Sequence, residues 1–203
     1  MTVFSDQLAA TARAERARWV GGAEDQAPWR DYVGQYWQSI GIDDLRGDTV
    51  VDGIRPAWSS AFVSFCVRKA GAGTRFRYSE ALCHYVKAAM DAASGTGNHG
   101  FAARKYETYR PRVGDIIVGG REYAKAFSYE QAAMVYVADS FYPSHGDIVV
   151  GIAPDHSYVE TLGGNVSQDV SGKRLALKAD GTLEKRKSGT ATYPWIAVLE
   201  CLL

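Results

Sequence analysis

The sequence lacks a surplus of charge, because its 203 residues include 23 Lys and Arg against 23 Asp and Glu. Proteins that bind nucleic acid need a basic surface to neutralise phosphates, so nucleic acid is not the expected main partner. A neutral total can still hide a local basic patch.

Apolar runs long enough for a membrane span or for the core of a signal peptide are also missing. We therefore expect no membrane span and a protein that is cytoplasmic as synthesised. Export to the periplasm or cell wall would then need a dedicated machine or cell lysis.

Cysteine is scarce and unpaired in its pattern. Cys66, Cys83 and Cys201 are odd in number and form no C-x-x-C motif, which predicts reduced, mostly buried thiols and no disulfide framework. A metal site built from His145, Asp147 and His84 is conceivable, but these residues have no recognised ligand spacing. We expect neither a metal nor another cofactor.

Hydrophobic periodicity predicts helices in the first half of the chain and strands in the second. The predicted helices are Phe4–Trp19, Trp29–Ile40, Pro56–Gly71, Ser79–Ala93 and a short one at Phe101–Tyr109. The predicted strands are Gly114–Val118, His145–Ile152, Tyr158–Leu162, and a further pair within Gln168–Leu177 and Trp195–Leu202. This order predicts an α+β fold with antiparallel pairing.

We expect a single domain over residues 1–203. It has a helical part at 1–55, followed at 56–203 by the helix that begins at Pro56 and by the sheet. Residues 119–143 form a long aromatic-rich insertion between the first two strands. An insertion of that length beside a site is typical of a lid or a subsite wall.

The predicted helix after Pro56 has the features of a nucleophile position. Ser59 and Ser60 lie in its first turn, ahead of a broad apolar surface. Unpaired backbone N–H groups and the positive end of the helix dipole stabilise a developing anion there.

The same stretch reads Trp58-Ser59-Ser60-Ala61-Phe62-Val63, and GDIIV (114–118), SHGDIVV (144–150) and GGNV (163–166) follow it in order. This succession resembles the papain-like peptidases of the CHAP and NlpC type, with Ser59 where that family has its cysteine. It also resembles an uncharacterised bacterial family, allied to those peptidases, in which serine is usual at this place. The resemblance implies a papain-like fold, with N-terminal helices packed on an antiparallel sheet. It also implies peptidase or amidase activity on peptidoglycan, at the stem peptide or at the bond that joins it to sugar.

Three residues would carry that chemistry. Ser59 would attack the carbonyl, His145 would act as general base and then acid, and Asn165 would hold the imidazole. Asp147 is an alternative orienting group, because it lies two residues after His145 on the same strand face. His84 resembles a histidine of the serine-bearing relatives and is a further candidate.

Serine is the difficulty in this scheme, since its hydroxyl depends on its base throughout. Ser59 is therefore a working nucleophile, a relic in a binding-only domain, or merely a helix cap. Ser60 could replace it, although it lies about 100° round the helix.

The alternative function is a catalytically silent domain that binds cell-wall peptide or a protein partner, such as a delivery machine or an inhibitor. A secreted effector or phage-associated module would leave the chemistry unchanged. In each case Trp58, Tyr123 and Tyr142 are predicted to line the ligand site.

Overall fold

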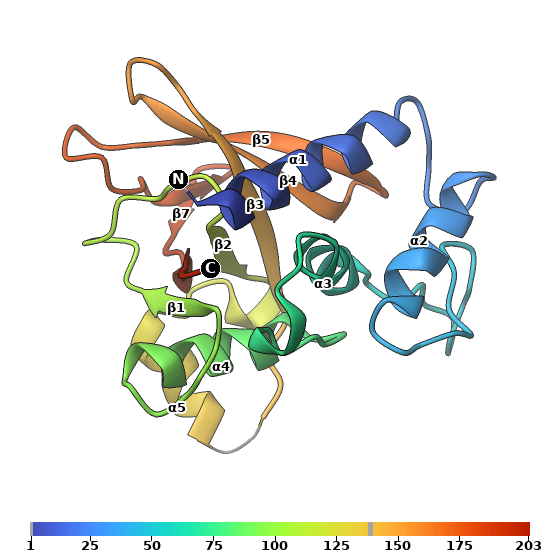
Figure 1. The fold of residues 1–203 in the computed structure, drawn as a ribbon, viewed down its shortest axis with the longest axis horizontal. Coiled ribbons are helices and arrows are strands. Elements are labelled where there is room, and N and C mark those ends of the chain that lie inside the picture. The colour runs from blue at the N-terminus through green and yellow to red at the C-terminus, as the bar shows by residue number, and fades with distance from the viewer. Residues whose placement is uncertain (1, 138–139) are drawn as a thin grey trace.

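The computed structural model describes residues 2–137 and 140–203 and has an α+β fold (Figure 1). The helices in these residues are α1 (Val3–Arg18), α2 (Trp29–Gln38), α3 (Ser59–Lys69), α4 (Leu82–Ala93) and α5 (Tyr129–Val137), with short 3-10 turns η1 (Gly73–Arg75) and η2 (Glu122–Ala124). None of these helices is long and apolar enough to span a membrane.

A six-stranded antiparallel sheet has the strand order β1-β8-β2-β3-β4-β5. Its strands are β1 (Phe101–Arg104), β2 (Ile116–Gly120), β3 (Ser144–Ile152), β4 (Tyr158–Val166), β5 (Asp169–Ala176) and β8 (Ala197–Cys201). A separate two-stranded hairpin consists of β6 (Arg186–Ser188) and β7 (Ala191–Tyr193). The predicted α+β class with antiparallel pairing is confirmed.

One predicted helix is wrong. The segment after Phe101 begins as β1, which pairs with β8 from Phe101↔Cys201 to Arg104↔Val198. Three of its four residues are buried, so both faces of this short strand are covered and no alternation marks it as a strand. The β6–β7 hairpin was not predicted, because its strands are short and largely exposed.

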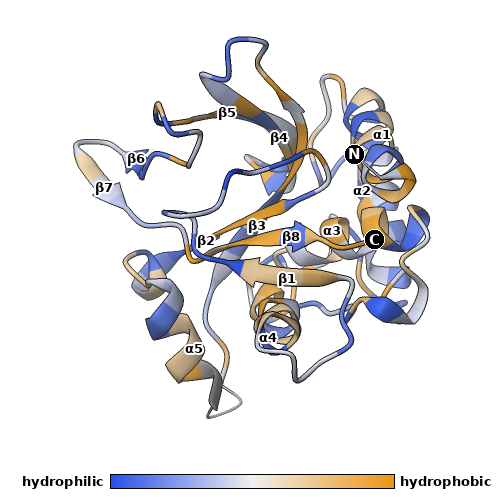
Figure 2. Ribbon diagram, turned by 60° about the vertical axis from the view of Figure 1, so that its left-hand side comes forward, coloured by the Kyte–Doolittle hydropathy of each residue, from blue (hydrophilic) through white to orange (hydrophobic). Residues whose placement is uncertain are grey.

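The two faces of the sheet are covered differently. Helices α1, α3 and α4 pack on one face, where Ile116, Val118 and Ile148 join the main hydrophobic core. On the opposite face Ile117 and Val149 pack with residues from loops, among them Tyr106, Leu183 and Trp195. Figure 2 shows the apolar strands β2, β3 and β8 at the centre and the hydrophilic β6 at the periphery.

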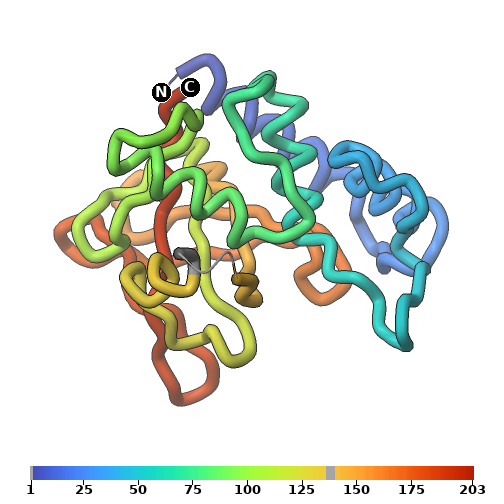
Figure 3. Tube along the Cα trace, turned by 90° about the horizontal axis from the view of Figure 1, so that it is seen from below, coloured from blue at the N-terminus to red at the C-terminus, as the bar shows by residue number. Residues whose placement is uncertain are grey.

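Trp58 fixes the start of α3 in the core. Its ring stacks on Trp19 at a centroid separation of 5.1 Å, and its Nε1–H donates to Glu24 Oε2 at 2.6 Å. Trp19 Nε1–H in turn donates to the Tyr36 hydroxyl, which donates to Glu15 Oε2. The buried indoles therefore have polar partners, and they join α3 to α1 and α2. Figure 3 shows α2 at one end of the molecule.

Strand β4 of the sheet packs against α3, and two of its residues, Gly163 and Gly164, face opposite sides of the sheet. A Cβ on Gly164 would lie 2.5 Å from Phe62 Cβ and 2.7 Å from the Trp58 ring. A Cβ on Gly163, on the other side, would lie 2.1 Å from Asp147 Oδ1 and 2.9 Å from His145 Nε2. Only glycine fits at either position, because both neighbours are in close contact with the backbone.

We predict that Gly164→Ala lowers the free energy of unfolding by about 1–3 kcal/mol, the usual cost of overpacking a core. Chemical denaturation of both proteins measures the difference. Gly34→Ala in α2 is the control, because the atom nearest to a Cβ there is Arg46 Cγ at 3.4 Å, an ordinary van der Waals distance. Equal stability of Gly164→Ala and wild type would contradict the close packing of β4 on α3.

Candidate functional site

His145 and Asp147 form a hydrogen-bonded pair on the sheet face opposite α3. Both lie on β3 two positions apart, and their neighbour Gly146 faces Leu82 of α4 instead. His145 Nε2 lies 3.0 Å from Asp147 Oδ1. The ionised carboxylate can only accept, so Nε2 carries the proton and donates it. His145 Nδ1 is then the free ring nitrogen, and it is buried without a partner among the described residues.

Asp147 is held as a carboxylate by two neighbours. Burial raises its pKa, but His145 and the Lys173 ammonium outweigh burial and lower the pKa to about 2. Lys173 Nζ lies 3.3 Å from Asp147 Oδ2. The Asp147 side chain is only 2% exposed to solvent. It therefore fixes the orientation of the His145 ring, as the aspartate of a catalytic triad does.

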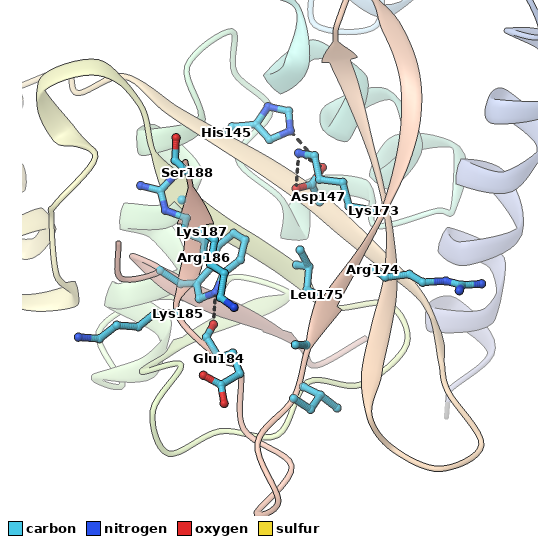
Figure 4. Close-up of a pocket in the computed structure, with 14 residues that line it drawn as sticks. His145, Asp147, Lys173, Arg174, Leu175, Glu184, Lys185, Arg186, Lys187 and Ser188 are labelled. Carbon is cyan, nitrogen blue, oxygen red and sulfur yellow. Dashed lines mark hydrogen bonds and ion pairs between the residues drawn. The ribbon is translucent and has the colours of Figure 1, made fainter. Parts of the chain in front are cut away.

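A cleft of about 850 Å³ opens beside this pair, between the sheet and the β6 strand (Figure 4). We call it the hairpin cleft, and the lining residues used below are Gly119, His145, Asp147, Lys173, Arg186 and Trp195. Its basic lining residues outnumber its acidic ones, so the neutral chain does hide a local basic patch.

Ser59 lines a different cavity, of about 410 Å³, which we call the serine pocket. Its described lining residues include Ser59, Ser60, Glu80, Arg121 and Ser144 but no histidine. The serine pocket lies on the helix-covered side of β3, where Leu82 also borders it. Parts of the predicted 119–143 insertion form its wall, through Arg121, Glu122 and Phe141.

The structure does not bring Ser59 and His145 together. The two residues line separate cavities, and β4 lies between the start of α3 and the His145–Asp147 pair. Within residues 2–137 and 140–203, no hydrogen bond joins them. The expected Ser–His contact is therefore corrected: side-chain alternation directs His145 to the opposite face of the sheet from the helix that carries Ser59.

Asn165 is not the partner of His145 either. It has a left-handed backbone with φ of 56°, which Asn tolerates better than most residues. Asp147 occupies the orienting position that was expected of Asn165, since it alone of the two bonds to the imidazole in the described part of the chain.

Ser60 and His84 belong to a third group, centred on Ser79. Ser60 Oγ donates to the Ser79 carbonyl at 2.8 Å, and His84 Nδ1 lies 2.8 Å from Ser79 Oγ. Ser79 Oγ also accepts from the backbone N–H of Ala81, just before α4 begins at Leu82. This arrangement joins α3 to the start of α4 and has a structural role.

A family model described as an uncharacterized protein conserved in bacteria (DUF2272) matches residues 23–201. The chain belongs to this family. No curated protein and no solved structure matches it. The DUF2272 match covers the helix start at Ser59, the His145–Asp147 pair and the hairpin cleft.

The aromatic residues predicted to line the site in this DUF2272 chain lie elsewhere. Trp58 is 1% exposed and belongs to the core, and Tyr142 is also buried, 5.8 Å from the Phe127 ring. Tyr123 is exposed, and its hydroxyl donates to the Phe141 carbonyl. None of the three lines the hairpin cleft or the serine pocket.

Sequence reasoning missed Lys173, Arg186 and Trp195. The signal for Arg186 was the basic run Lys185-Arg186-Lys187, which stands out in a chain of balanced charge. That run looks like an ordinary solvated segment until the hairpin folds back over β2. In the described residues, no group of three or more His, Cys, Asp or Glu side chains could hold a metal ion.

The pH dependence of stability tests the state of Asp147. Its pKa in the folded protein is about 2, below the ordinary value of 3.8. The carboxylate therefore stabilises the fold above about pH 4, and this contribution of about 2 kcal/mol is lost as pH falls from 4 to 2.

We predict that Asp147→Asn lowers the free energy of unfolding at pH 7 and flattens its fall in that acid range. Urea denaturation between pH 2 and pH 7 measures both effects. Asp44→Asn is the control, because Asp44 is exposed and its side chain makes no hydrogen bond or ion pair within residues 2–137 and 140–203. An unchanged acid profile in Asp147→Asn would show that Asp147 is not paired in solution.

Proposed function

We propose that this chain is a peptide-binding domain, related to the CHAP and NlpC peptidases, that takes cell-wall peptide in the hairpin cleft and does not cleave through Ser59. The relation to those peptidases rests on the order of the motifs around Ser59, His145 and Gly163–Asn165. The observation that carries the loss of Ser59 chemistry is the position of β4 between Ser59 and His145.

A serine without a base does not react at neutral pH. The hydroxyl needs a neighbouring group to accept its proton during attack. No histidine lines the serine pocket, and Glu80 and Glu122 are its only carboxylates among the described lining residues. The favourable helix N-terminus at Ser59 therefore lacks the second half of a catalytic site.

The hairpin cleft has the properties of a ligand site. It is larger than the serine pocket, and it combines the Trp195 surface with charged groups held in fixed positions. Pockets that combine apolar surface with a few oriented polar groups are the usual binding sites of proteins. The basic lining suits cell-wall stem peptides, which carry free carboxylates.

One observation favours a second candidate function, a peptidase or amidase. The His145–Asp147 pair is the orienting half of a hydrolytic triad, with a bond of 3.0 Å between Nε2 and Oδ1. In this candidate, His145 would activate a water molecule or a nucleophile at the hairpin cleft. Such a reaction would need a small movement of the His145 ring that opens its buried Nδ1 to the cleft.

Mass spectrometry of soluble peptidoglycan fragments separates the two functions. We predict that wild type, Ser59→Ala and Ser59→Cys all leave the fragments intact, because even a thiol at residue 59 has no histidine partner. We also predict that the fragments shift the NMR signals of hairpin-cleft residues in wild type.

Three outcomes would contradict the proposed function. New fragments that Ser59→Ala abolishes would establish a serine hydrolase. New fragments that survive in Ser59→Ala but disappear in His145→Ala would assign hydrolysis to the His145–Asp147 pair. Absence of both cleavage and NMR shifts would reject cell-wall peptide as the ligand.

A further inference from the structure

Arg186 places a cation in the hairpin cleft that no described carboxylate neutralises. Its Nε–H donates to the Pro194 carbonyl at 3.0 Å, and Nη2 donates to the Lys125 carbonyl at 2.6 Å. The guanidinium also lies against the Tyr193 and Trp195 rings, at 5.6 Å and 5.9 Å from their centroids. These contacts fix the position of the group and leave Nη1 without a hydrogen-bond acceptor among the described residues.

The guanidinium lies over Gly119, the cross-strand neighbour of His145. Residue 119, which pairs directly with His145 across β2 and β3, is a glycine. A Cβ on Gly119 would lie 3.1 Å from Arg186 Nη1 and 3.3 Å from the Trp195 ring. Side chains that face each other across such a pair start about 5 Å apart. Arg186 therefore occupies the space beside the imidazole that a side chain at residue 119 would fill.

Most other charges of the cleft are engaged or directed elsewhere. Lys173 is paired with Asp147, and Arg174 with Glu160. In Figure 4 Lys185 and Arg174 extend away from His145, and the Glu184 carboxylate lies at the far end of the cleft. Lys187, also in the lining, is exposed. Arg186 is the basic residue of the lining that two backbone carbonyls hold in place without an ion-pair partner among the described residues.

A half-buried cation without an anion is costly, and burial lowers the pKa of Arg186. The side chain stays charged at neutral pH all the same. A carboxylate accepts a short, charge-assisted hydrogen bond from a guanidinium N–H. The two backbone carbonyls hold one edge of the group and leave Nη1 for a ligand.

We propose that Arg186 anchors a carboxylate of the ligand in the hairpin cleft, so that the cleft selects peptides with a free carboxylate beside His145. This inference rests on the proposed binding function for the location of the site. It does not depend on the ligand coming from the cell wall.

NMR of the Arg186 side chain tests the anchor with minimal probes. The Nε–H signal of Arg186, protected by its bond to Pro194, is followed during titration with acetate, acetamide, inorganic phosphate and matched sodium chloride. We expect acetate to shift this signal and acetamide and chloride to leave it in place. A shift with phosphate but not with acetate, or with neither, would overturn the inference.

Variants then test the anchor on peptides. Calorimetry with a carboxylate-bearing peptide should show that Arg186→Gln weakens binding about tenfold or more, as expected for the loss of a charge-assisted pair. Gly119→Ala should weaken it as well, because the new methyl group crowds Nη1 while every charge remains. Lys178→Gln removes the same charge from a residue outside the cleft lining and should change affinity less than about twofold. Circular dichroism of each variant confirms that it is folded.

The two proposals fail in different ways. If peptidoglycan fragments do not bind but acetate and other carboxylate peptides bind through Arg186, the anchor stands and the cell-wall function falls. If the fragments bind wild type, Arg186→Gln and Gly119→Ala equally, the cleft function stands and the anchor is wrong.

Discussion

The close passage of β4 over the start of α3 is the constraint on which the rest of the structure depends. Gly163 and Gly164 allow it, since any side chain there would strike the His145–Asp147 pair or Phe62 and Trp58. The strand brings the nucleophile-type helix and the histidine pair within one strand's thickness of each other. It also separates them, because one lies above the sheet and the other below it.

Because of that separation, the residues that the family resemblance assigns to one catalytic site lie in two cavities. The serine pocket keeps the helix N-terminus and the hydroxyl, whereas the hairpin cleft keeps the imidazole and its carboxylate. Neither cavity holds both halves among its described lining residues. The hairpin cleft also holds Lys173 and Arg186 in place, and the proposed function rests on these cations.

The sequence was a good guide where local pattern decides structure, and a poor one where distant segments meet. Periodicity located α1 to α4 and the long strands within a few residues, because each has a buried stripe of its own. It also placed Asp147 on the same strand face as His145, where the two are bonded. It failed at Phe101–Arg104, a short buried strand whose partner β8 lies almost a hundred residues away. Whether a strand histidine points toward a helix elsewhere in the chain depends on the side of the sheet on which that helix packs. No motif around Ser59 or His145 encodes it.

Arg186 illustrates the same limit for a residue that the sequence alone does not single out. In the sequence it is one of three consecutive basic residues, and nothing distinguishes it from Lys185 or Lys187. In the fold, the Pro194 and Lys125 carbonyls immobilise it and Gly119 makes room for it beside His145. A glycine opposite the histidine is thus as much a part of the site as the charged groups, since without that space the cation would be displaced from the imidazole. On the proposed function, selection at this cleft arises from the combination of a missing side chain, a held cation and an oriented ring, contributed by three segments that meet only in the folded chain.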